Sequence, residues 1–270
     1  MGKLKNNNIW YLENIPRRLF LYWGRNKPLS FLRYMTVLSF SKLNPDWDIL
    51  IYYPSNISYI ETWKTREQKE NKYNGKDFFT ELDNINNVIT IESKFTPKIS
   101  EIFKSDIFRV HALATYGGVW SDFDILYTKP ITRLHINSIE NKLVDAVICQ
   151  HKYSFAGFLM SKAYSYTYCK LAVNVLGAEA TYYTSILDNY YYDVFSNPLI
   201  EDVVVNLDME SVYPISWEKP EGLLDNILQE EHTIGIHWYA GSNIMSSHEG
   251  EELCKCDSAL CKEARRIYEI

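Results

Sequence analysis

The feature that most constrains the fold is a pattern of strand, helix and strand within residues 19–53. Residues 19–23 (LFLYW) form a short apolar run before Gly24, which predicts a buried strand and a turn. A helix is expected from Ser30 or Pro28 to about Leu43, because the Asn44-Pro45 pair cannot continue it. Residues 47–53 (WDILIYY) predict a second strand. Strands joined through a helix are usually parallel, so this unit predicts an α/β fold with a mostly parallel central sheet flanked by helices.

The rest of the chain continues the alternation of short apolar runs and amphipathic segments. We find neither an internal repeat nor a linker, so we expect residues 1–270 to form one domain. Residues 60–87 are polar and predict one or two exposed helices before the next strand. Further strands are expected at 88–91, 119–127, 145–149, 155–161, 203–205 and 234–238, and helices at 98–116, 163–176, 181–194 and 249–268.

Charge and composition exclude several classes of protein. The net charge is −6 and the basic residues are scattered, which argues against a nucleic-acid partner. No apolar stretch approaches the roughly 20 residues that cross a bilayer, and the N-terminus does not resemble a signal peptide. The five cysteines are odd in number and clustered late, so we expect reduced thiols and a cytoplasmic protein rather than a disulfide framework.

Asp122 and Asp124 are the strongest candidates for chemistry. They follow a double glycine and are interleaved with apolar residues in the segment 119–126 (VWSDFDIL), which is not the pattern of a solvated face. Residues two apart on a strand point to the same side, so we expect the two carboxylates to converge. Converging like charges need neutralisation, and hard oxygen ligands suit Mn²⁺ or Mg²⁺. The alternative for an Asp-X-Asp pair alone is a pair of turn or surface acids.

Asp106 and Arg109 lie three residues apart in the predicted helix 98–116, and so they share a face. Two interpretations are open from the residues alone. The pair is either an intrahelical ion pair, or a site where Asp106 accepts from sugar hydroxyls and Arg109 donates to sugar or phosphate.

Three segments together resemble a known family. They are residues 15–24 (IPRRLFLYWG), 105–109 (SDIFR) and 116–124 (YGGVWSDFD), of which the last two are the more specific. In order and spacing they are similar to the sugar transferases that carry an Asp-X-Asp motif. That family includes fungal initiating mannosyltransferases, bacterial capsule enzymes and the glucosylating domains of large clostridial toxins. The resemblance covers residues 15–54 and 98–130, with a weaker match at 234–243.

This resemblance implies a GT-A fold, a nucleotide-sugar-binding α/β sandwich, with residues 15–130 as its donor half and 131–270 as its acceptor side and C-terminal lid. It implies that Trp23, with Tyr22 beside it, binds the base by stacking. Ser105, Asp106 and Arg109 would hold the donor sugar. Asp124 would be the direct metal ligand, and Asp122 would contact ribose, sugar or the metal's shell.

The segment 235–242 (GIHWYAGS) resembles the His-Trp segment near the family's C-terminus. His237 is expected either to bind the metal or phosphate, or to be an ordinary buried histidine. Trp238 and Ser242 would close over the diphosphate as part of a lid. Zinc binding by His248 and Cys254, Cys256 and Cys261 is a weaker alternative, because their spacing fits no common finger. The tyrosines at 182, 183 and 190–192 either stack on an acceptor sugar or pack.

We therefore expect a metal-dependent glycosyltransferase. Its donor is a nucleotide-sugar, with a UDP-linked hexose or N-acetylhexosamine favoured and GDP-mannose second. Its acceptor is a glycan, a lipid-linked saccharide or a protein, and the resemblance implies retention of the anomeric configuration. The rival functions are a non-catalytic sugar- or nucleotide-binding module on the same fold and a metal-dependent nucleotide-sugar hydrolase.

Overall fold

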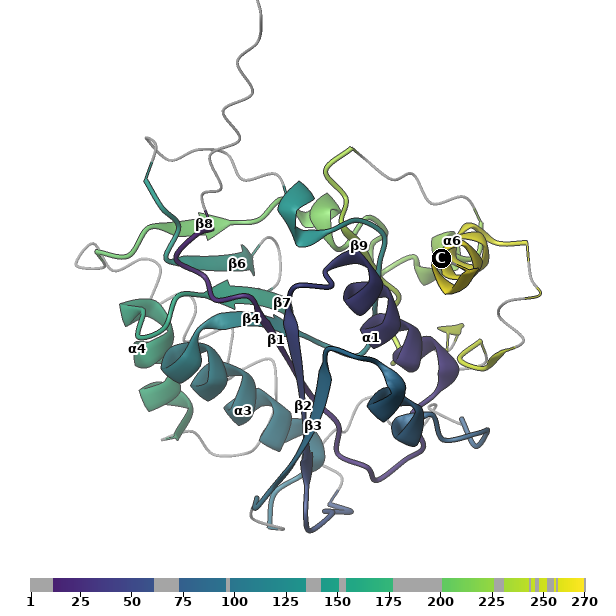
Figure 1. Ribbon diagram of the computed structural model, residues 1–270, viewed down its shortest axis with the longest axis horizontal. Helices are drawn as coiled ribbons and strands as arrows, with labels where there is room; N and C mark the ends of the chain where they lie inside the picture. Colours follow the sequence, from purple (N-terminus) through teal and green to yellow (C-terminus); the bar gives the residue numbers. More distant parts are fainter. Residues whose placement is uncertain are drawn as a thin grey trace, which may run out of the picture.

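The computed structural model describes residues 12–60, 73–95, 98–134, 142–150, 154–176, 201–225, 231–242, 244–245, 248–251, 255 and 257–269. Their centre is a seven-stranded sheet with the order β3-β2-β1-β4-β7-β6-β8, flanked by helices on both faces (Figure 1). A two-stranded sheet, β5-β9, lies beside it. The predicted α/β class is confirmed.

The first half of the sheet is parallel, as the strand-helix-strand pattern predicts. β1 (Arg18–Tyr22) pairs with β2 (Asp48–Pro54) on one side and with β4 (Gly118–Ser121) on the other. β2 in turn pairs with β3 (Val88–Ser93), also in parallel. These four strands place their carboxyl ends along one edge, which is where open α/β sheets bind ligands.

The second half of the sheet is mixed. β7 (Ser154–Ser161) runs antiparallel to β4 and to β6 (Ala146–Gln150), and β6 pairs in parallel with β8 (Val204–Asn206). In the small sheet, β5 (Ile125–Tyr127) is antiparallel to β9 (Gly235–His237). This last pairing brings a late segment of the chain directly beside the residues that follow β4.

Helices cover the sheet according to the alternation of side chains in β1. Leu19 and Leu21 face the core that also contains α1 (Phe31–Leu43), whereas Phe20 and Tyr22 face the core with α3 (Glu101–Tyr116). α4 (Tyr166–Leu176) packs on the α3 side and α6 (Ala259–Glu269) on the α1 side (Figure 1).

Local signals set the helix ends. The Ser30 and Ser100 side chains accept hydrogen bonds from backbone N–H groups in the first turns of α1 and α3. Gly117 ends α3 with φ +63°, where a Cβ would lie 2.4 Å from the Ala163 nitrogen, so this position requires glycine. Short 3₁₀ turns occur at Phe79–Asn84, Ile131–Arg133, Met209–Ser211 and Pro220–Leu223.

Three expectations need correction or lie outside the described part. The closing helix begins at Ala259 rather than at residue 249. Between 73 and 87 the described helical segment is the 3₁₀ turn Phe79–Asn84, and residues 61–72 are outside the described residues, as are the predicted helix 181–194 and its tyrosines. Cys261 is disulfide-bonded, which contradicts the expectation of reduced thiols, while Cys149 and Cys169 are free. A bonded Cys261 is not available as a zinc thiolate.

No helix in the described part of the chain is long and apolar enough to cross a membrane.

Candidate functional site

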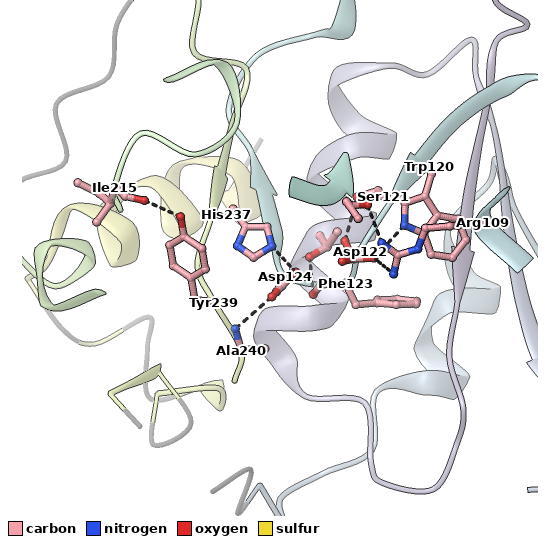
Figure 2. Close-up of polar contacts among 12 residues, drawn as sticks. Arg109, Trp120, Ser121, Asp122, Phe123, Asp124, Ile215, His237, Tyr239 and Ala240 are labelled. Carbon is pink, nitrogen blue, oxygen red and sulfur yellow. Dashed lines mark hydrogen bonds and ion pairs between the residues drawn. The ribbon is translucent and has the colours of Figure 1, made fainter. Parts of the chain in front are cut away.

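Asp122 and Asp124 lie in the short turn between β4 and β5, not on a continuous strand as the sequence pattern predicted. Figure 2 shows the turn residues Asp122, Phe123 and Asp124, whose backbone is held by three hydrogen bonds. The Asp122 N–H donates to the Gly157 carbonyl at 2.8 Å, and the Trp238 N–H donates to the Asp124 carbonyl at 2.8 Å. The Thr36 hydroxyl of α1 donates to the Phe123 carbonyl at 2.9 Å. The turn thus brings both carboxylates to one place by backbone geometry rather than by strand alternation.

His237 completes a group of three possible metal ligands. The register of β5 and β9 places it opposite Ile125, and one ligand atom each from Asp122, Asp124 and His237 lie within 4.8 Å of one another. Ligand atoms that share one Mn²⁺ or Mg²⁺ at about 2.1 Å are roughly 3–4.2 Å apart, so atoms up to 4.8 Å apart would draw together by a few tenths of an ångström around a single ion. Carboxylates suit Mn²⁺ or Mg²⁺, whereas an imidazole is a donor that later transition metals prefer. The predicted pairing of His237 with the two aspartates is therefore present.

Asp124 is the more strongly ionised of the two acids. Burial opposes its charge, but His237 Nε2 at 3.1 Å from Oδ1, the positive charge of Arg33 and the Ala240 N–H together lower its pKa to about 2. Its side chain keeps 15% exposure, so it remains reachable from outside the protein. In this arrangement the histidine lies beside the carboxylate where a cation would bind.

Arg109 connects the α3 helix to the same place (Figure 2). Its Nη2 lies 3.0 Å from Asp106 Oδ1 and 3.4 Å from Asp122 Oδ1, and its Nη1 donates to the Ala156 carbonyl at 2.8 Å. Its guanidinium also lies 5.1 Å from the centre of the Trp120 ring. The intrahelical ion pair of the first interpretation exists, and it is buried and linked to the Asp122 carboxylate.

Trp120 contacts the same Asp122 oxygen as Arg109 does. Its indole Nε1 donates to Asp122 Oδ1 at 2.8 Å. Burial raises the pKa of Asp122 and so does the negative charge of Asp124, whereas Arg109 and the indole oppose this shift. A bound cation would favour the ionised form of Asp122 further.

Asp106 is the most enclosed acid of the site, with 1% exposure. Neither of its oxygens accepts a hydrogen bond within the described residues, and its ion-pair partner is Arg109. Burial raises its pKa to about 7, with the Asp122 charge adding to the shift and Arg109 opposing it. The folded protein therefore favours a protonated Asp106 more than the unfolded chain does.

The stability that Asp106 contributes should depend on pH. A raised folded pKa gives stabilisation that is complete below the ordinary value of 3.8 and is lost as pH rises through about 7. Asp106→Asn has no carboxyl group to titrate at this position. The melting temperature of the variant minus that of the wild type should therefore increase from pH 5 to pH 8. Thermal melts in EDTA measure this difference. The exposed Asp48→Asn serves as the matched control, and a difference that is flat with pH would contradict the prediction.

The other predicted site residues are distributed around this centre. Trp23 is half-buried at the end of β1, and its ring is 5.5 Å from that of Phe123. Tyr22 is buried on the opposite face, where its hydroxyl donates to Glu101 at 2.5 Å. Ser105 is half-buried on α3. Trp238 is fully buried with an unpartnered Nε1 within the described residues, and the Ser242 hydroxyl accepts from the Met245 N–H at 3.2 Å.

Several residues that lie against the candidate site were not predicted from the sequence. Gly157 lies against the His237 ring, and a Cβ there would be 3.1 Å from Nε2, so a larger residue would press on the imidazole. Arg33 and the buried Glu249 form an ion pair, and Trp120 orients Asp122. Trp120 could have been found from the sequence, because it lies within the motif that contains Asp122. Neither periodicity nor spacing indicates the pairing of Arg33 with Glu249, which is 216 positions away.

Comparison with solved structures supports the fold. The glycosyltransferase GlyE from Streptococcus pneumoniae TIGR4 is similar with a TM-score of 0.51 and 13% identity, over 95% of this chain and 61% of GlyE. This chain thus spans about three fifths of the length of GlyE. PaToxG glycosyltransferase has a TM-score of 0.45 and 16% identity, over 66% of this chain and 68% of PaToxG. At this identity the likeness to GlyE shows the shared GT-A-like fold.

Sequence comparison gives the family. No curated protein matches the chain significantly. The family described as capsular polysaccharide synthesis protein matches residues 63–233, which is more than half of the chain and includes Asp106, Arg109, Asp122 and Asp124. The chain therefore belongs to the capsular polysaccharide synthesis protein family and has the fold of GT-A glycosyltransferases.

Proposed function

We propose that this protein is a metal-dependent glycosyltransferase in a single catalytic domain. It transfers a hexose or N-acetylhexosamine from a nucleotide-sugar, with UDP favoured and GDP-mannose second, to a hydroxyl of a glycan, a lipid-linked saccharide or a protein. The observation that carries the proposal is the convergence of Asp122, Asp124 and His237 at the carboxyl end of β4. Membership of a capsular polysaccharide synthesis family and the GT-A-like fold support it.

Each residue has a chemical role under this proposal. Asp122, Asp124 and His237 hold Mn²⁺ or Mg²⁺, which when bound stabilises the negative charge of the departing nucleoside diphosphate. Arg109, whose planar fork already contacts two carboxylates, fixes the donor sugar beside the metal. Asp106 accepts from the same sugar, because its oxygens accept no hydrogen bond within the described residues. Ser105 lies on α3 next to Asp106 in the sequence.

The lid and the base site are assigned in the same way. Trp238 offers the diphosphate a buried N–H that has no partner among the described residues, and Ser242 ends the turn that follows Trp238. Trp23 stacks on the base at the end of β1. Tyr22 faces the opposite side of the sheet, where its hydroxyl donates to Glu101, so under this proposal it contributes the backbone that leads into Trp23.

The reaction needs no nucleophilic side chain on this chain. The bond between the anomeric carbon and the diphosphate oxygen breaks, and its electron pair goes to the diphosphate. The acceptor oxygen bonds to the same face of that carbon, and its proton passes to the departing phosphate oxygen. This route retains the anomeric configuration. NMR of the product tests it, and an inverted anomer would contradict it.

The two rival functions differ in what the site must contain. A non-catalytic module would not require the metal group, yet the acids and His237 are close together and reachable. A hydrolase would release the nucleoside diphosphate at the same rate with and without an acceptor. The site residues therefore favour an enzyme over a binding module, and acceptor dependence separates a transferase from a hydrolase.

The direct test is release of nucleoside diphosphate from a panel of UDP-, GDP- and CDP-sugars with Mn²⁺, Mg²⁺ or EDTA. Saccharide acceptors are added in a second series. We expect release from one nucleotide family only with metal, and faster release with the right acceptor. Release that no acceptor accelerates would support the hydrolase, and no release from any donor would support the binding module.

Trp120→Phe should weaken metal binding without unfolding the protein. The change removes the indole donor to Asp122 Oδ1 but keeps an aromatic ring against Arg109. Loss of a hydrogen bond that orients a ligand typically costs 10- to 100-fold in metal affinity, and we expect about tenfold here. Calorimetric titration with Mn²⁺ in the presence of the bound nucleotide measures it. The matched control is Trp47→Phe, in the core away from the site, and an unchanged Mn²⁺ affinity in Trp120→Phe would contradict the role.

A further inference from the structure

Arg33 lies at the start of α1, on the helix face that borders the Asp122–Asp124 turn. Thr36, one helical turn further along on the same face, donates its hydroxyl to the Phe123 carbonyl at 2.9 Å. The Arg33 guanidinium lies 5.1 Å from the centre of the Trp23 ring and 5.5 Å from that of Trp238. Two tryptophans from the ends of β1 and β9 therefore enclose one cation beside the candidate metal site.

Among the described residues, Arg33 is hydrogen-bonded through one nitrogen, its Nε. Its Nε lies 3.1 Å from Glu249 Oε2, and the two side chains are 12% and 0% exposed. Its two terminal nitrogens donate to none of the described residues. An arginine fork binds phosphate through its terminal nitrogens, so the binding edge of Arg33 is fixed in orientation and unoccupied.

The two indoles add further donors to the same place. Trp23 Nε1 and Trp238 Nε1 are both buried and have no hydrogen-bond partner in the part of the chain that is described. Buried N–H groups without an acceptor are rare, because each loses its bonds to water. An oxyanion beside Arg33 would supply the missing acceptor.

Glu249 determines the charge of this cluster. Its Oε1 accepts no hydrogen bond within the described residues, and its carboxylate neutralises the guanidinium. The Arg33–Glu249 pair therefore has no net charge, and an anion would be held by directed N–H donors. Trp238, whose ring lies 5.5 Å from the Arg33 guanidinium, donates its backbone N–H to the Asp124 carbonyl at 2.8 Å, which places the cluster beside the candidate metal site.

We propose that the terminal nitrogens of Arg33, oriented by Glu249, bind the diphosphate of the nucleotide-sugar donor, with the Trp23 and Trp238 indoles as neighbouring donors. This inference rests on the proposed function. Arg33 thereby donates hydrogen bonds to the leaving group from the side of α1, while Asp122, Asp124 and His237 hold the metal on the other. Glu249 is a positioning residue that connects the C-terminal segment to this contact.

Arg33→Gln tests the proposal when UDP and uridine are compared, with GDP and guanosine in parallel, by calorimetric or fluorescence titration with Mn²⁺. The variant loses charge-assisted hydrogen bonds to phosphate, so UDP or GDP affinity should fall roughly 10- to 100-fold. The affinity for the matching nucleoside, which has no phosphate, should stay within about threefold. Arg17→Gln is the matched control, because Arg17 is exposed and paired with Asp46.

Folding is controlled by a second variant. Arg33→Gln leaves the buried Glu249 without its counter-charge, whereas Arg33→Gln/Glu249→Gln removes both charges and should fold. The double variant should show the same selective loss of diphosphate affinity. An unchanged diphosphate affinity would overturn the proposal. Equal losses of affinity for the nucleoside and the diphosphate would also overturn it, because they would show that Arg33 acts only through the Trp23 ring. A wild-type protein that binds neither UDP nor GDP would instead overturn the proposed function itself.

Discussion

Replacing Asp124 by asparagine is expected to abolish metal-dependent nucleotide binding and to reduce sugar transfer at least about a hundredfold. Asp124 has the lowest pKa of the site, about 2, so it supplies a full negative charge to a cation at any working pH. An amide is neutral and a far weaker ligand for Mn²⁺ or Mg²⁺. The measurements are Mn²⁺ titration with nucleotide present and the rate of nucleoside diphosphate release.

The substitution is designed to separate metal binding from folding. Asp124 Oδ2 accepts from the Ala240 N–H at 3.1 Å, and an asparagine carbonyl can accept the same bond. The fold should therefore be kept, although the melting temperature in EDTA should fall because asparagine lacks the charge that interacts with His237. Asp48→Asn, at an exposed position in β2, is the control for the chemistry of the change. Metal-dependent nucleotide binding of normal strength in Asp124→Asn would show that this acid is not the ligand.

Arg109→Gln should have the largest effect on stability. The guanidinium is the ion-pair partner of Asp106 and of Asp122, and the Arg109 and Asp106 side chains are only 4% and 1% exposed. Removing one member of a buried pair leaves an uncompensated charge, which typically costs about 3–5 kcal/mol in the free energy of unfolding. Urea unfolding at pH 8, where Asp106 is ionised in the folded state, measures the loss.

The double variant Arg109→Gln/Asp106→Asn identifies the cause of that loss. It removes the buried carboxylate together with its cation, so more than half of the lost stability should return. Arg109→Gln should also lose sugar transfer, and the double variant should remain inactive because the donor contact is still absent. A double variant no more stable than Arg109→Gln would contradict the account, since the cost would then come from lost packing against Trp120.

The sequence predicts the order of elements well, because the signals involved are local. Apolar runs and the Asn44-Pro45 stop place β1, α1 and β2 to within a residue or two, and Gly117 ends α3 by its positive φ. The start of α6 is wrong because the amphipathic pattern from 249 onward does not distinguish a helix that begins there from one that begins at Ala259. The disulfide bond of Cys261 was not predicted, because the number and spacing of cysteines do not show which of them pair.

The candidate site is predictable only in part. The spacing of Asp122 and Asp124 indicated convergence, but the backbone turn that achieves it depends on β7, α1 and β9 together. The approach of His237 follows from the β5–β9 register, which joins segments about 110 residues apart. The pairing of Arg33 with Glu249 is recognisable only after folding, because it is long-range and neither residue lies in a motif.

The most direct test of the central claim is a thermal-shift titration of the wild-type protein with UDP, GDP and CDP, each with Mn²⁺, with Mg²⁺ and with EDTA. A ligand at about 100 times its dissociation constant adds roughly 2.7 kcal/mol to the free energy of unfolding. The account predicts that one nucleotide raises the melting temperature only with metal, and that Asp124→Asn and His237→Ala both remove the shift. A shift of equal size in EDTA, or none with any nucleotide, would contradict a metal-dependent nucleotide site at Asp122, Asp124 and His237.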